Sequence, residues 1–189
     1  MVNMRGDPSI SPVVSEIVNA ALWGMEGIRF ENLDKCPYCK GKIRGYDFKK
    51  KHFACVLSEG KPYYIDVAVK RFFCHECGRL SYAYEPFYPG TRMGIPVVDL
   101  CVSLGSSMPF NRVSGVLKKM NVVVDRGTVR NYVNMQYHEE RCVDMFGLNL
   151  PFSIMNLGIK VINKAGAPMS GDEALVAMGF DPHKLKGLY

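Results

Sequence analysis

The sequence has little of what most enzyme and membrane-protein classes require. It contains one tryptophan and four histidines among 189 residues, with no glycine-rich phosphate-binding loop and no recognisable nucleophile motif. No stretch is long and apolar enough to cross a membrane, and residues 1–30 lack the basic start and apolar core of a secretory signal. These absences predict a cytoplasmic protein that is not an enzyme, with no catalytic residues, no membrane partner and no small-molecule substrate.

Cysteine, by contrast, is well represented. The seven cysteines are an odd number, which leaves a thiol over in any disulfide scheme and favours a reducing compartment. Four of them form Cys36-Pro37-Tyr38-Cys39 and Cys74-His75-Glu76-Cys77. Two such pairs are typical of structural zinc, because each tight turn aims both sulfurs at one point and four thiolates complete a tetrahedral shell. The sequence therefore predicts a structural Zn²⁺ ion at Cys36, Cys39, Cys74 and Cys77.

Several alternatives to zinc stay open. Iron also accepts four thiolates, and the pairs could instead form disulfides or be incidental buried cysteines. The gap between the pairs is about twice the usual span of roughly 15–20 residues, and a two- or three-stranded hairpin would bridge it. We expect the other three cysteines, Cys55, Cys101 and Cys142, to be buried thiols.

Basic charge is concentrated in the same part of the chain. The net charge is +6, and the span from Lys40 to Arg92 holds eleven Lys or Arg against five Asp or Glu, a surplus equal to the whole net charge. Clustered cations beside aromatic residues are expected of a phosphate-binding surface. The candidate phosphate contacts are Lys49, Lys50, Lys51 and Arg71. A solvated basic face that only maintains solubility is the alternative.

The hydrophobic pattern predicts a helix, then strands, then more helices. Ser11-Pro12 and the apolar spacing after it predict a helix over residues 12–25. Short strands are expected at 42–44, 53–57 and 63–73, with a turn at 58–62. An extended aromatic linker follows over 78–92. We expect residues 1–30 to form an N-terminal helical segment and residues 31–92 to form a zinc ribbon with this linker.

Residues 93–146 show the layout of a helix-turn-helix unit. Two apolar helical stripes, at 95–105 and from Pro109 to Met120, are followed by Asp125 as N-cap of a third helix. In that layout the third helix enters the DNA major groove and its first turns reach base edges. The candidate base contacts are Arg126, Thr128, Arg130, Asn131 and Asn134, and the candidate phosphate contacts are Arg112, Lys118 and Lys119. A three-helix core with a solvated polar face is the alternative.

The remaining residues, 147–189, are expected to form a C-terminal tail with short helices. The third helix is expected to run on through His138 and Glu140 toward Met145. Ser170 and Glu173 form a capping box, and residues 154–162 are apolar but ambiguous between strand and helix. Packing or self-association as a homodimer is the expected role. The fold class is thus α+β: a small β-rich zinc ribbon joined to an α-helical helix-turn-helix unit, with a short helical tail.

The ribbon end, from Val69-Lys70-Arg71-Phe72-Phe73 through Cys74-His75-Glu76-Cys77-Gly78-Arg79, resembles the N-terminal zinc ribbon of several insertion-sequence transposases. Those families show basic residues and an aromatic before the second Cys-x-x-Cys-Gly. The stretches 111–114 and 124–130 are similar to the helix-turn-helix that follows it, so the resemblance covers residues 36–135. It implies a metal-stabilised module that binds double-stranded DNA.

The chain departs from those transposases after Glu140. Their RNase H-like domain uses three metal-binding carboxylates, whereas here the candidates Asp144, Asp172, Glu173 and Asp181 lack a strand-rich scaffold. We therefore expect a zinc-stabilised double-stranded DNA-binding protein, transposase-derived or regulator-like, without strand-transfer activity. It would be nucleoid-associated if it binds DNA. Two alternatives stay open: a zinc-ribbon adaptor for a protein of the transcription machinery, and a binder of RNA or single strands through Tyr63, Tyr64, Phe72, Phe73 and Tyr82.

Overall fold

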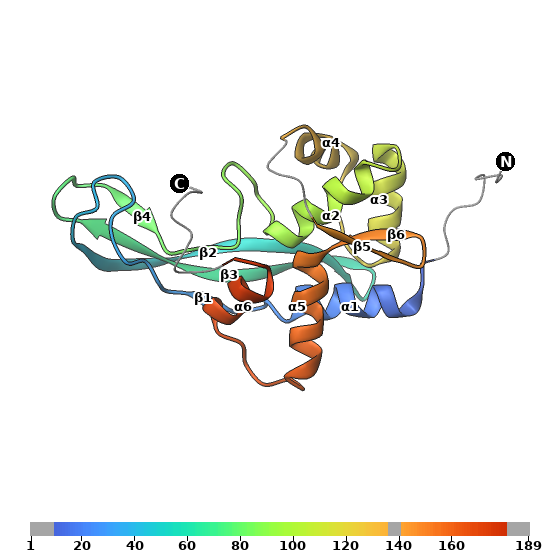
Figure 1. Ribbon diagram of the computed structural model, residues 1–189, viewed down its shortest axis with the longest axis horizontal. Coiled ribbons are helices and arrows are strands. Elements are labelled where there is room, and N and C mark those ends of the chain that lie inside the picture. The colour runs from blue at the N-terminus through green and yellow to red at the C-terminus, as the bar shows by residue number, and fades with distance from the viewer. Residues whose placement is uncertain (1–9, 136–140, 181–189) are drawn as a thin grey trace.

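A long β-hairpin forms the axis of the protein. The computed structural model describes residues 10–135 and 141–180. Strand β2 (Ile43–Ser58) pairs antiparallel with β3 (Lys61–Cys74), and the two run along the long axis of the molecule (Figure 1). Glu59 and Gly60, which join them, have φ angles of 51° and 76°. Two successive positive φ values make the type I′ turn that matches the twist of a hairpin.

Two short strands extend this sheet along the other edge of β3. Strand β1 (Arg29–Phe30) runs parallel to β3 beside Ala68, and β4 (Leu80–Tyr82) runs antiparallel to it beside Phe73. The register between β2 and β3 shifts twice, between Gly45 and Phe48 and between His52 and Ala54. Such bulges increase the local twist of the sheet and change which side chains share a face.

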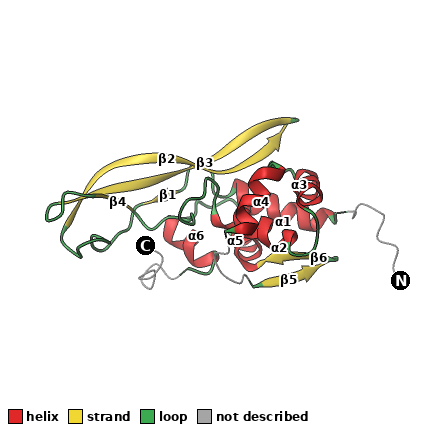
Figure 2. Cartoon of the chain, turned by 90° about the horizontal axis from the view of Figure 1, so that it is seen from above, coloured by secondary structure: helices red, strands yellow, loops and turns green. Residues whose placement is uncertain are grey.

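Six helices are described, and most lie beside the half of the hairpin that ends in the turn (Figures 1 and 2). They are α1 (Pro12–Trp23), α2 (Ile95–Gly105), α3 (Phe110–Lys119), α4 (Arg126–Asn134), α5 (Phe152–Asn163) and α6 (Gly171–Ala177). A second antiparallel pair, β5 (Cys142–Met145) and β6 (Leu148–Pro151), lies against α2. None of the described helices has the length and apolarity to cross a membrane.

The hairpin and the helices share one hydrophobic core. The α3–α4 connection is held against β2 by backbone hydrogen bonds: Leu57 N donates to Asn121 O at 2.8 Å and Val123 N donates to Cys55 O at 2.8 Å. Helix α5 packs against α1, and buried side chains from both belong to the same cluster as those of β2 and β3. The helices are therefore anchored to one half of the hairpin rather than linked to it by a free segment.

One buried carboxylate connects three segments of this core. Asp99 on α2 is 3% exposed, and its two oxygens accept hydrogen bonds from Tyr88 Oη at 2.8 Å and Ser153 Oγ at 2.6 Å. A buried carboxylate is tolerated only when it is hydrogen-bonded. Asp99 thus fixes the segment before α2 and the start of α5 relative to one another.

The mixed α+β class predicted from the sequence is confirmed, with three corrections of detail. Helix α4 ends at Asn134 and Cys142–Met145 is a strand, so the expectation of a helix reaching Met145 is wrong; His138 to Glu140 lie outside the described residues. The strands expected at 42–44 and 53–57 are one continuous strand, β2. Cys55 and Cys101 are buried as expected, but Cys142 is exposed.

The C-terminal region is less tail-like than expected. It opens with strand β6, which pairs with β5 just before it, and residues 154–162 lie in α5, which packs on α1. The capping box is confirmed: Glu173 N donates to Ser170 Oγ at 3.2 Å, and Ser170 N donates to Glu173 Oε2 at 2.9 Å. The part of the predicted tail from residue 181 onward, which includes Asp181, lies outside the described residues.

The α1–α5 contact gives a stability prediction. A Cβ atom at Gly158 would lie 2.5 Å from Ile17 O, so Gly158→Ala should lower the free energy of unfolding by about 1–3 kcal/mol by forcing the helices apart. A Cβ at Gly115, in α3, meets nothing within 4 Å. Gly115→Ala should therefore raise stability by about 0.5–1 kcal/mol through helix propensity. Urea unfolding at saturating zinc measures both; changes of the same sign would contradict the packing argument.

Candidate metal centre and basic surfaces

The two Cys-x-x-Cys turns have the same backbone geometry. In the first, Lys40 N donates to Cys36 O at 2.9 Å and Cys36 N to Gly41 O at 3.2 Å. In the second, Gly78 N donates to Cys74 O at 3.0 Å and Cys74 N to Arg79 O at 3.0 Å. The residue after each second cysteine is left-handed, with φ of 63° at Lys40 and 70° at Gly78. The turns are thus two copies of one knuckle, joined through β2 and β3.

The knuckles bring four sulfurs together at the open end of the hairpin. Cys36 Sγ lies 3.6 Å from Cys77 Sγ and Cys39 Sγ lies 3.4 Å from Cys74 Sγ, with all four sulfurs within 4.8 Å of one another. Sulfurs bound tetrahedrally at about 2.3 Å from zinc stand about 3.8 Å apart. A disulfide needs about 2.05 Å, and all seven cysteines are free. Among the described residues, this is the only group of three or more His, Cys, Asp or Glu arranged to hold a metal ion.

The ionisation of these thiols also fits a cation. Burial raises the pKa of Cys36, but hydrogen bonds from the amides of Cys39 and Tyr38 outweigh it and lower that pKa to about 7. The Gly41 amide favours the Cys39 thiolate, yet the neighbouring thiols and desolvation raise its pKa to about 12. Four thiolates therefore do not coexist without a positive charge among them. A bound metal ion supplies that charge and releases the protons.

A carboxylate braces the two knuckles against each other. Glu76, between the second pair of cysteines, accepts a hydrogen bond from Lys42 N at 3.2 Å, just beyond the first knuckle. A Cβ atom at Gly41 would lie 2.3 Å from Glu76 Cδ, so this close approach requires glycine. Across the same gap, the Arg79 guanidinium carbon stands 4.9 Å from the centroid of the Tyr38 ring.

The basic residues predicted on the hairpin lie on opposite faces of it. Lys50 Nζ pairs with Asp66 at 2.6 Å, Lys51 Nζ pairs with the half-buried Glu85 at 2.6 Å, and Arg71 pairs with Asp47 through both carboxylate oxygens. Lys49 is exposed and has no carboxylate partner among the described residues; its Nζ stands 5.9 Å from the Tyr82 ring. Of the four, Lys49 alone makes no ion pair among the described residues; its charge acts on Glu85 at longer range, where it opposes the rise that burial causes in the pKa of that carboxyl.

Helix α4 presents its predicted contacts to solvent. Asp125 caps it, accepting from Thr128 N at 2.9 Å and from Thr128 Oγ1 at 2.5 Å, so the Thr128 hydroxyl is already engaged. Val129 and Tyr132 are buried against α2 and α3. The other predicted contacts on the helix are exposed and have no hydrogen-bond or ion-pair partner among the described residues: Arg126, Arg130, Asn131 and Asn134. On α3, Lys118 and Lys119 are exposed and Arg112 is half-buried.

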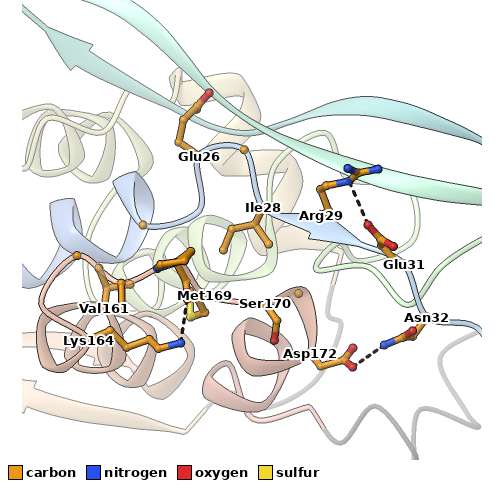
Figure 3. A pocket seen from close by; sticks show the side chains of 16 residues that line it. Glu26, Ile28, Arg29, Glu31, Asn32, Val161, Lys164, Met169, Ser170 and Asp172 are labelled. Carbon is orange, nitrogen blue, oxygen red and sulfur yellow. Dashed lines mark hydrogen bonds and ion pairs between the residues drawn. The ribbon is translucent and has the colours of Figure 1, made fainter.

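A cavity that no sequence motif indicates measures about 640 Å³ and lies between the α1–β1 connection, the end of α5 and the start of α6 (Figure 3). Its polar side chains are engaged with one another or with backbone: Arg29 with Glu31 at 3.0 Å, Asn32 with Asp172 at 2.5 Å, and Lys164 with Pro168 O at 3.0 Å. No single motif marks it, because segments far apart in the chain form its walls.

Known proteins offer no match to this chain. It matches no family model, no curated protein and no solved structure. The resemblance of residues 36–135 to transposase DNA-binding regions therefore stays a prediction. What the structure shows is a four-cysteine cluster that could hold a metal ion, with the metal not identified.

We predict that the cluster binds one zinc ion per chain and that each thiolate is needed. Cys39 is exposed, so Cys39→Ser changes little but the ligand, and it should abolish stoichiometric zinc binding and lower thermal stability. Cys142→Ser, at another exposed cysteine, is the matched control and should keep both. Metal content by plasma emission spectrometry and thermal unfolding measure the outcome. Full zinc content in Cys39→Ser would show that the cluster is not the site.

The left-handed residues of the two knuckles give a second prediction. Gly78→Ala places a Cβ at a φ of 70°, which costs about 1–2 kcal/mol, so zinc affinity should fall about fivefold to thirtyfold. Lys40→Gly removes the same strain from the other knuckle and should leave zinc affinity equal or higher. Competition with a chromophoric chelator measures both affinities, and an unchanged affinity in Gly78→Ala would contradict the prediction.

Proposed function

We propose that this protein is a zinc-stabilised double-stranded DNA-binding protein that reads base edges through helix α4. The observation that carries the proposal is the exposed face of α4. Arg126, Arg130 and Asn134 are spaced four residues apart, so they share one side of the helix. Arginine pairs with guanine and asparagine with adenine in the major groove. Because these side chains lack partners among the described residues, no internal ion pair has to break before they contact DNA.

The packing of α2, α3 and α4 supports a helix-turn-helix assignment. Helix α4 contacts both α2 and α3, and its first turn begins directly after the Asp125 cap. A recognition helix is held in this way by two helices, with its N-terminal half projecting. Exposed Lys118 on α3 would then contact a phosphate. The two knuckles and strands β2, β3 and β4 would form a zinc ribbon in the same protein.

We also propose that the protein binds DNA without cutting or joining it. Of the carboxylates left after α4, Asp172 accepts a hydrogen bond from Asn32 and Glu173 is held by Lys164 at 2.9 Å. Asp144 lies in β5, and no carboxylate cluster suited to a metal ion occurs among the described residues. Binding alone fits a regulator or a protein derived from a transposase.

The test is base discrimination by α4. A duplex site is selected from random DNA with zinc-loaded protein, and fluorescence anisotropy compares that site with random duplex. Arg130→Ala should weaken binding to the selected site by about 1–3 kcal/mol and hardly change binding to random duplex. Lys118→Ala, on the neighbouring helix, should weaken both equally and reduce the salt slope by about 0.9.

Equal losses on both duplexes in Arg130→Ala would reject base reading by α4. No binding to any duplex at low salt would reject the proposed function and favour a zinc-ribbon adaptor that contacts a protein. Zinc content and thermal unfolding, measured on each variant, ensure that the affinities refer to folded protein.

A further inference from the structure

The pairing register places the side chains of strands β2, β3 and β4 on two faces, and rings lie beside cations on both of them. Residues directly opposite one another in a sheet lie on the same face. Arg44 is opposite Phe73, which is opposite Leu80 on β4. Two residues along β3, Arg71 is opposite Tyr82. On the reverse face, Lys70 is opposite Phe48.

The first of these faces carries rings and cations in contact. The Arg44 guanidinium carbon stands 5.5 Å from the Phe73 ring centroid, and Lys49 Nζ stands 5.9 Å from the Tyr82 ring centroid. Arg44 and Lys49 are exposed, while Phe73, Tyr82 and Arg71 are half-buried. Because these contacts agree with the register, the five side chains form one surface, which we call the ribbon platform: Arg44, Lys49, Arg71, Phe73 and Tyr82.

The ribbon platform is bounded at both ends. Toward the helices, the segment after β4 covers the same face, where Lys51 pairs with Glu85 and lies 4.9 Å from the Phe87 ring centroid. Toward the open end lie the knuckles. Arg71 is held by Asp47, so the platform has three cations against one carboxylate. Arg44 and Lys49 have no carboxylate partner among the described residues.

We propose that the ribbon platform binds an unpaired strand of DNA, by stacking bases on Phe73 and Tyr82 and holding phosphates with Arg44 and Lys49. Aromatic rings beside cations on a sheet face are the features that take single strands, because every unpaired base offers a ring face. Tyr82 is opposite Arg71, so the Phe73 and Tyr82 rings are offset by two residues, or about 6.8 Å, along the strand direction. That offset is about twice the 3.4 Å between bases in a duplex strand. Bases stacked on both rings would therefore belong to an extended strand.

This inference rests on the proposed function, because it assigns a second contact of the same DNA. Helix α4 would hold duplex, and the ribbon platform, at the half of the hairpin that extends away from most helices (Figure 2), would take a strand that has left the duplex. Tyr63 and Phe72, which the sequence also suggested for stacking, do not belong to the platform. Tyr63 stacks on Trp23 at 5.2 Å, and Phe72 is 8% exposed.

The test compares labelled oligothymidine with a duplex of equal length, using zinc-loaded full-length protein. Phe73→Ile and Tyr82→Ile keep strand propensity but remove the ring, and each should weaken oligothymidine binding about fivefold or more while duplex affinity changes less than twofold. Phe48→Ile is the matched control, since Phe48 lies on the reverse face and is 37% exposed. It should leave oligothymidine affinity unchanged.

A second pair of variants avoids changes to packing. Arg44→Gln and Lys49→Gln alter exposed cations, and together they should reduce the salt slope of oligothymidine binding by about 1.4. Unchanged oligothymidine affinity in the ring variants, or an equal loss in Phe48→Ile, would overturn the inference. Duplex binding without any oligothymidine binding would overturn it and leave the proposed function intact. Ring-dependent oligothymidine binding without duplex binding would support the platform and overturn the proposed function.

Discussion

The convergence of four sulfurs at the open end of the β2–β3 hairpin is the constraint on which that half of the structure depends. An isolated two-stranded hairpin is at best marginally stable in water. At the turn end, the core and the hydrogen bonds to Asn121 and Val123 hold the strands. At the open end, β4 adds only three residues, and none of the four cysteines belongs to the hydrophobic core cluster. A metal ion bound to both knuckles would close the chain between Cys36 and Cys77 there.

Local signals allowed parts of this structure to be predicted residue by residue. The Cys-x-x-Cys spacing, the Asp125 cap and the Ser170 capping box each involve groups within four residues of one another, and the structure has all three. Strand β2 was expected as two pieces because Lys49, Lys50 and Lys51 interrupt its apolar pattern. It is continuous because β3 pairs along its length, and because Lys51 is neutralised by Glu85, a contact that the local sequence does not indicate.

Features with weak turn signals or with contacts between distant segments could not be predicted. The β5–β6 pair turns at Phe146 and Gly147, with φ angles of 54° and 78°. Phe-Gly is a much weaker turn signal than Asn-Gly. The sequence pattern therefore predicts that the preceding helix continues through residues 142–145. The cavity beside α6 and the carboxylate partners of Lys50 and Lys51 depend on segments far apart in the chain.

The two surfaces proposed to contact DNA belong to parts of the protein with different sources of stability. Helix α4 is fixed by Val129 and Tyr132 in the hydrophobic core, which needs no metal. Phe73 and Tyr82 are held by the pairing of β3 with β4, directly beside Cys74. If the four cysteines hold a metal ion, removing it should therefore loosen the ribbon platform while α4 stays in place. Metal occupancy would then control the contact with an unpaired strand separately from the contact with duplex, because local opening follows the contacts that each region makes.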